Sequence, residues 1–72
     1  MNDRPFDLLT SAIGKGVLVE LKDGVSFRGE LKAFDVHMNL VLGNAEKHEG
    51  GELKGKYGMV LLRGDNVLLI SP

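Results

Sequence analysis

A run of alternating side chains at residues 25–34 constrains the fold of this chain more than any other feature. One face of the run carries Val25, Phe27, Leu31 and Ala33, and the other carries Ser26, Arg28, Glu30 and Lys32. Such alternation predicts a β-strand with one face buried and one face in water. Gly29 interrupts the apolar face at mid-strand, where glycine marks a sharp bend or a close backbone approach. A strand bent at its centre favours a small sheet that curls into a barrel.

One short helix is expected before this strand. Asp3 or Arg4 precedes Pro5, and proline suits the first turn of a helix because no amide donor is needed there. Apolar residues then recur at helical spacing as far as Ile13, and Gly14 follows as a stop signal. The pattern predicts an amphipathic helix of two to three turns.

Four further strands are expected around the central one. Asp23-Gly24 separates two β-rich runs and is typical of a hairpin. The predicted strands cover residues 17–21, 25–34, 40–45, 53–62 and 66–70, with a charged, glycine-containing loop at 46–52. His48 lies in that loop, where we expect an ordinary solvated histidine. The fold class is therefore all-β: a short N-terminal helix followed by a strongly bent, five-stranded antiparallel barrel.

Composition predicts that this chain associates with itself. A chain of 72 residues without cysteine cannot rely on disulfides or a thiolate metal site, and it buries little surface alone. The last predicted strand, Val67-Leu68-Leu69-Ile70, is apolar on both faces, so its outer face has nothing to cover it. Such an edge favours pairing with the fourth strand of a neighbouring copy, head to tail, which can close into a ring.

Charge and hydropathy limit the classes of partner and the cellular location that are expected for this chain. The net charge is −1, so diffuse attraction to duplex DNA is not expected, and any nucleic acid must be recognised by local geometry and stacking. The apolar segments are too short to span a membrane, and the N-terminal residues do not resemble a signal peptide. We expect a cytoplasmic protein with no metal and no cofactor.

Two short polar turns carry the candidate functional residues. The first contains Asp35, His37 and Asn39, and the second is Arg63-Gly64-Asp65. If the fold brings the turns together, they combine an imidazole, a guanidinium, an amide and a carboxylate. A nucleobase could stack between the two flat π systems while the amide bonds its edge. This combination predicts a site for single-stranded RNA.

The same two turns resemble the motifs of a known family. Phe27-Arg28-Gly29 followed by residues 34–42, Phe-Asp-Val-His-Met-Asn-Leu-Val-Leu, resembles the first Sm motif, and residues 62–67, Leu-Arg-Gly-Asp-Asn-Val, resemble the second. With the Arg4-Pro5-Phe6 helix start and the Ile70-Ser71-Pro72 end, the match covers essentially the whole chain, most closely like the archaeal Sm-like (Lsm) proteins. One departure is Phe34, where several archaeal relatives carry tyrosine. The bacterial Sm-like RNA chaperone has a different second motif.

The resemblance implies one Sm-like domain over residues 1–72, with the Sm fold, an SH3-like barrel. It implies a homo-oligomeric ring, usually heptameric, that binds uridine-rich single-stranded RNA at the rim of its pore and serves RNA processing or ribonucleoprotein assembly, where other RNA-processing proteins are possible partners. Six or eight subunits stay open. The implied RNA-binding residues are His37, Asn39, Arg63, Asp65 and Asp35, with Arg4 as a secondary contact on the helix-bearing face.

Roles for these residues also follow from their chemistry. The Asn39 amide offers one donor and one acceptor, which match the O4 acceptor and the N3–H donor of uracil. Cytosine reverses this order of donor and acceptor. Asp65 could hold either the Asn39 amide or the Arg63 guanidinium, and Asp35 could brace its turn. Two alternatives stay open: a nuclease with His37 as general base, and a structural ring or protein scaffold that does not read RNA.

Overall fold

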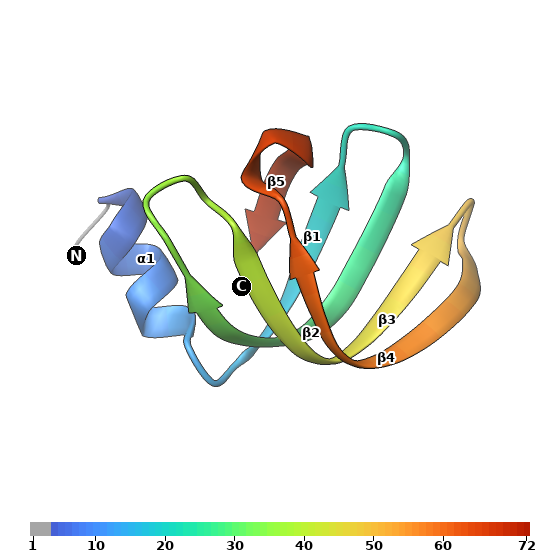
Figure 1. Cartoon of the computed structure of the whole chain (residues 1–72), viewed down its shortest axis with the longest axis horizontal. Helices are drawn as coiled ribbons and strands as arrows, with labels where there is room; N and C mark the ends of the chain where they lie inside the picture. The colour runs from blue at the N-terminus through green and yellow to red at the C-terminus, as the bar shows by residue number, and fades with distance from the viewer. Residues whose placement is uncertain (1–3) are drawn as a thin grey trace.

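The computed structural model describes residues 4–72, which form one helix and a five-stranded antiparallel sheet (Figure 1). The elements are α1 (Pro5–Ala12), β1 (Gly16–Leu21), β2 (Val25–Phe34), β3 (Leu40–Glu49), β4 (Glu52–Leu62), the short 3-10 helix η1 (Gly64–Asn66) and β5 (Val67–Ser71). The strand order is β4-β3-β2-β1-β5, so the strongly bent sheet is an open barrel with β4 and β5 as its two edges. The predicted fold class is confirmed.

Helix α1 begins where the proline predicted it. Arg4 is the N-cap residue and Pro5 occupies the first turn, while the Asp3 alternative lies outside the described residues. The helix buries Leu9 and Ala12 against the sheet. Its first turn also contacts the end of β2, because the rings of Phe6 and Phe34 stack with centroids 6.1 Å apart and planes 11° apart. Of the helices in residues 4–72, none is long and apolar enough to cross a membrane.

The bend in β2 has the cause that its glycine indicated. A Cβ built on Gly29 would lie 2.9 Å from the Gly43 carbonyl oxygen and 3.1 Å from Cα of Ala45 on β3. Opposite Gly29 the β2–β3 register shifts, and Asn44 adopts a positive φ of 48°. A bulge on β3 therefore folds the two strands together at this point, and only glycine permits the close approach.

The predicted burial of Ala33 is wrong, because a second bulge follows Leu31. Leu31 pairs with Leu42 and Ala33 pairs with Val41, which leaves Lys32 as an extra residue on β2. An extra residue reverses the faces beyond it. Leu31 is accordingly fully buried, Ala33 is exposed and Phe34 is half-buried.

The predicted loop at residues 46–52 is also mostly strand. Strand β3 continues to Glu49 and pairs with β4 as far as Glu49 opposite Glu52. The reversal needs only Gly50 and Gly51, whose φ angles of 57° and 82° suit a tight hairpin turn. His48 therefore lies on a strand, with 23% of its side chain exposed, rather than in a solvated loop.

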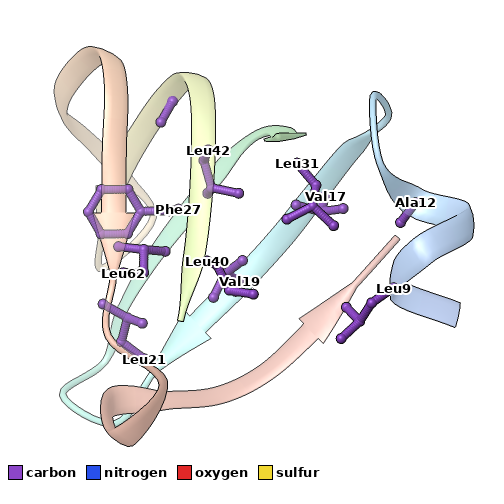
Figure 2. Close-up of a cluster of buried hydrophobic side chains, with 11 residues drawn as sticks. Leu9, Ala12, Val17, Val19, Leu21, Phe27, Leu31, Leu40, Leu42 and Leu62 are labelled. Carbon is purple, nitrogen blue, oxygen red and sulfur yellow. The ribbon is translucent and has the colours of Figure 1, made fainter. Parts of the chain in front are cut away.

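The core fills the inside of the bend (Figure 2). Val19, Leu31, Leu40 and Leu42 are its largest fully buried side chains. Helix α1 covers one end of this cluster, and Figure 2 shows Leu9 and Ala12 on the helix facing it. The segment from Leu40 to Leu42 thus anchors the start of β3, immediately after the first candidate turn.

The two edge strands leave apolar side chains uncovered. On β5, Val67 and Ile70 pack against the core, whereas Leu68 and Leu69 are 64% and 43% exposed. On β4, Met59 and Leu61 are 62% and 64% exposed. The last strand is therefore apolar on both faces, as its sequence indicated.

Candidate functional site

The fold brings the two polar turns into direct contact. The Gly64 amide donates a hydrogen bond of 2.8 Å to Oδ1 of Asn39 across 25 positions of sequence. A Cβ on Gly64 would overlap the carbonyl oxygen of His37 and lie 2.8 Å from the Met38 carbonyl carbon. The backbones meet so closely that residue 64 must be glycine.

Asp35 organises the first turn. Its Oδ1 accepts hydrogen bonds from the amides of His37, at 2.9 Å, and Asn39, at 3.0 Å. Its Oδ2 accepts a third, of 3.0 Å, from Nδ2 of Asn39. The bracing role expected of Asp35 is therefore present, and it extends to the side chain of Asn39. Met38 adopts a positive φ of 64° to complete the turn.

Hydrogen bonding also lowers the pKa of Asp35 below its usual 3.8. The side-chain bond from Asn39 contributes most, and the backbone bonds and the nearby His37 act in the same direction. Partial desolvation opposes them. Because each donor favours the ionised carboxylate, Asp35 carries its negative charge at neutral pH.

Asp65 has only one of the two contacts considered for it. Its Oδ2 lies 3.5 Å from Nη2 of Arg63, and the two side chains are 71% and 79% exposed. An exposed ion pair of this length holds the guanidinium loosely. The Asn39 amide is held by Asp35 and Gly64 instead, so that alternative for Asp65 is wrong.

The predicted residues surround one hollow of about 500 Å³, lined by His37, Asn39, Arg63, Gly64 and Asp65. Asp35 supports it from the first turn. One Nδ2 proton and one Oδ1 lone pair of Asn39 are used within the turns, so one donor and one acceptor site are left for a ligand. The exposed imidazole and guanidinium supply two flat surfaces. Arg4, at the start of α1, does not line this hollow.

Gly64 belongs to the site but was not among the residues predicted for it. Its role comes from an amide donor and from the absence of a side chain, and the only sequence signal was a glycine between two charged residues of a turn. In the part of the chain that the structure describes, no three histidine, cysteine, aspartate or glutamate side chains form a group that could hold a metal ion.

Comparison with known proteins places the whole arrangement in a family. The family model for the LSM domain matches residues 7–72. An snRNP Sm-like protein of Methanosarcina barkeri is 53% identical over 72 residues, which cover 100% of both chains. The solved Sm protein of Pyrococcus abyssii, in complex with a uridine heptamer, is 48% identical with a TM-score of 0.95 and covers 97% of this chain and 99% of its own.

A second solved structure extends the comparison. The SmAP1 heptamer of P. aerophilum is 43% identical with a TM-score of 0.90, over 100% of this chain and 96% of its own. The residues matched by the family model include the two turns that form the candidate site. This chain therefore belongs to the LSM-domain family and groups with its archaeal Sm-like members.

Proposed function

We propose that this protein forms a homo-oligomeric ring that binds uridine-rich single-stranded RNA at the two-turn site. The observation that carries the proposal is the Asn39 amide, held at one end by Asp35 and at the other by the Gly64 amide. A fixed amide presents its remaining donor and acceptor in one order, which suits uracil and opposes cytosine. The similar P. abyssii protein was solved with a uridine heptamer, which supports the same ligand class here.

The proposed roles divide between stacking and edge recognition. His37 and Arg63 sandwich the base, Asn39 bonds its edge, and Asp35 and Asp65 orient Asn39 and Arg63 respectively. Stacking contributes roughly 1–3 kcal/mol per base, so one pocket alone binds weakly. A ring that presents several pockets to one strand gains affinity because later contacts are intramolecular.

The ring is supported by the two exposed edges and by the relatives. Met59 and Leu61 on β4 and Leu68 and Leu69 on β5 offer complementary apolar strips at opposite edges of the sheet. Pairing β5 of one copy with β4 of the next would cover both strips and repeat around a closed ring. Two similar archaeal proteins are heptamers, so seven is the number we propose.

Titration of oligouridine and oligocytidine against the intact protein and against Asn39→Ala tests the proposal. The intact protein should prefer oligouridine. Asn39→Ala should reduce that preference, because the contact to the edge of the base is lost while base stacking is kept. Native mass measurement should show the same ring in this variant. Equal affinity of the intact protein for both homopolymers would contradict the proposed site. A ring that binds neither homopolymer would favour the scaffold alternative.

We propose that this protein binds RNA without cleaving it, in contrast to the nuclease alternative. Labelled RNA incubated with the protein, with and without divalent metal, should be recovered intact. Arg4 stays a proposed secondary RNA contact on the helix-bearing face. Residues 1–72 are proposed to form one domain. We propose that the protein acts in the cytoplasm, in RNA processing or ribonucleoprotein assembly.

A further inference from the structure

A second polar hollow lies at the far end of β2 and β3 from the two-turn site. Its volume is about 500 Å³, and it is lined by Gly24, Ser26, Arg28, His48, Gly50 and Gly51. Ser26 stands directly opposite His48 across the β2–β3 ladder, and Arg28 follows two positions along the same face. Gly24 of the β1–β2 turn and Gly50 and Gly51 of the β3–β4 turn are among its lining residues. We call it the hairpin hollow.

Two polar side chains of the hairpin hollow, Arg28 and Ser26, are hydrogen-bond donors without partners in residues 4–72. The Arg28 guanidinium and the Ser26 hydroxyl make no hydrogen bond or ion pair there. Three lysines on β2, β3 and β4 behave differently, since each pairs with a glutamate two positions away on its own strand, as in Lys32–Glu30 at 2.8 Å. Each of these lysines thus has a glutamate partner, whereas Arg28 has no ion-pair partner in the described residues.

His48 adds a third donor because of how its ring is buried. Its Nδ1 is buried without a hydrogen-bond partner within the described chain. A buried N–H without an acceptor is costly, so the ring proton is favoured on Nε2. Nε2 lies 3.8 Å from the Glu46 carboxylate, which is beyond hydrogen-bonding distance. The Nε2–H group can therefore serve a ligand.

We propose that the hairpin hollow binds a phosphate group, free or in an RNA backbone, through Arg28, Ser26 and His48. Guanidinium presents paired donors that match phosphate oxygens, and the hydroxyl and imidazole add single donors. The residues that line the hollow include no carboxylate. Glu46, opposite Arg28 on β3, limits the net positive charge, so free phosphate binds weakly. An RNA already held at the two-turn site binds more readily because its remaining phosphates are tethered to the same protein.

The subunit contacts assigned to the proposed ring do not use the residues that line the hairpin hollow. None of its lining residues comes from β4 or β5, the edges assigned to subunit contacts. An RNA strand leaving the two-turn site could therefore reach it from the same subunit along β2 and β3. The phosphate site itself does not depend on the proposed function, whereas its RNA ligand does.

Inorganic phosphate titrated against ¹⁵N-labelled protein, at constant ionic strength set with chloride, tests the site directly. Saturable amide shifts should concentrate at residues 24–28 and 48–51 and disappear in Arg28→Gln. Lys56→Gln is the matched control, because it removes an equal exposed charge from the neighbouring β4, opposite Glu46 and outside the hollow. Absent shifts, or shifts that survive Arg28→Gln, would overturn the proposal.

Long polyuridine distinguishes the two sources of phosphate. Each neutralised phosphate contributes a slope of about −0.7 to log affinity against log salt for single strands. If RNA is the ligand, Arg28→Gln should make the salt slope for long polyuridine shallower by about this amount per engaged subunit. Lys56→Gln should leave that slope unchanged, and Arg28→Gln should leave the slope for a short oligouridine unchanged. An unchanged slope together with retained phosphate shifts in the unmodified protein would support the site and assign it to free phosphate.

Discussion

The direction in which the Asn39 amide faces is determined by one carboxylate. Asp35 accepts a hydrogen bond from Nδ2 of Asn39, which leaves Oδ1 of Asn39 to accept a hydrogen bond from the Gly64 amide. The sequence predicted every polar side chain of this group, but Asp65 was the only aspartate considered as the holder of Asn39. The contact with Asp35 depends on the left-handed conformation of Met38, and no sequence pattern indicated a positive φ at a non-glycine residue.

Asp35→Asn should reduce both affinity and base discrimination. An amide at this position would place a donor against the Nδ2 donor of Asn39, or lose the bonds to the backbone of the turn if it rotated. We expect a roughly three- to tenfold loss of oligouridine affinity and a weaker preference over oligocytidine. Asp23→Asn is the control, because Asp23 also accepts a backbone hydrogen bond in a turn but lies outside the site. Matching losses in the two variants would contradict the role of Asp35.

Acid should remove the stability that Asp35 contributes. Its pKa in the folded protein is lowered from 3.8, chiefly by the Asn39 side chain, so folding favours the ionised form. The contribution is fully present above the unfolded-state pKa and is lost as the pH falls through the lower folded-state pKa. Unfolding free energies of the intact protein and Asp35→Asn should differ by a constant amount at neutral pH and converge below 3.8. A difference that grew on acidification would have the wrong sign.

At the scale of elements, periodicity predicted which segments form strands, but it could not locate the irregularities between them. The alternation at residues 25–34 and the bend at Gly29 agree with β2. The bulge at Lys32 was missed because Ala33 continues the apolar alternation of Leu31 although it lies on the opposite face. The length of β3 was underestimated because the charged residues 46–49 lack an apolar alternation, although their backbones pair with both β2 and β4.

Phe6→Ala should loosen α1 from the end of β2. Phe6 and Phe34 are nearly parallel at 6.1 Å, and such a pair contributes about 0.5–1.5 kcal/mol beyond the area it buries. Leu8→Ala is the control, since Leu8 is 47% exposed, as is Phe6, on the same helix and is not part of an aromatic pair. Denaturant unfolding should show a loss for Phe6→Ala larger than the control by about 1 kcal/mol. Equal losses would mean that the ring contact adds no stability.

At the scale of the whole molecule, the described chain has a small core and two uncovered edges. Its buried apolar residues number eleven, and domains of this size bury too little surface to be comfortably stable alone. The sequence indicated the β5 edge through residues apolar on both faces. It did not indicate which side chains of β4 would be exposed, because their alternation resembles that of an ordinary half-buried strand.

Leu68→Asp should therefore prevent ring assembly without unfolding the subunit first. Leu68 is 64% exposed at a register shift in β5, so the monomer loses little packing, whereas a proposed β5–β4 contact would bury an unpaired carboxylate. Native mass spectrometry should show monomers or disordered aggregates in place of the ring. Leu8→Asp on α1 introduces the same charge at a site 47% exposed and distant from both edges in sequence, and it should leave the ring mass unchanged. A ring of full mass in Leu68→Asp would show that a different surface joins the subunits, and the exposed strip on β5 would then require another partner.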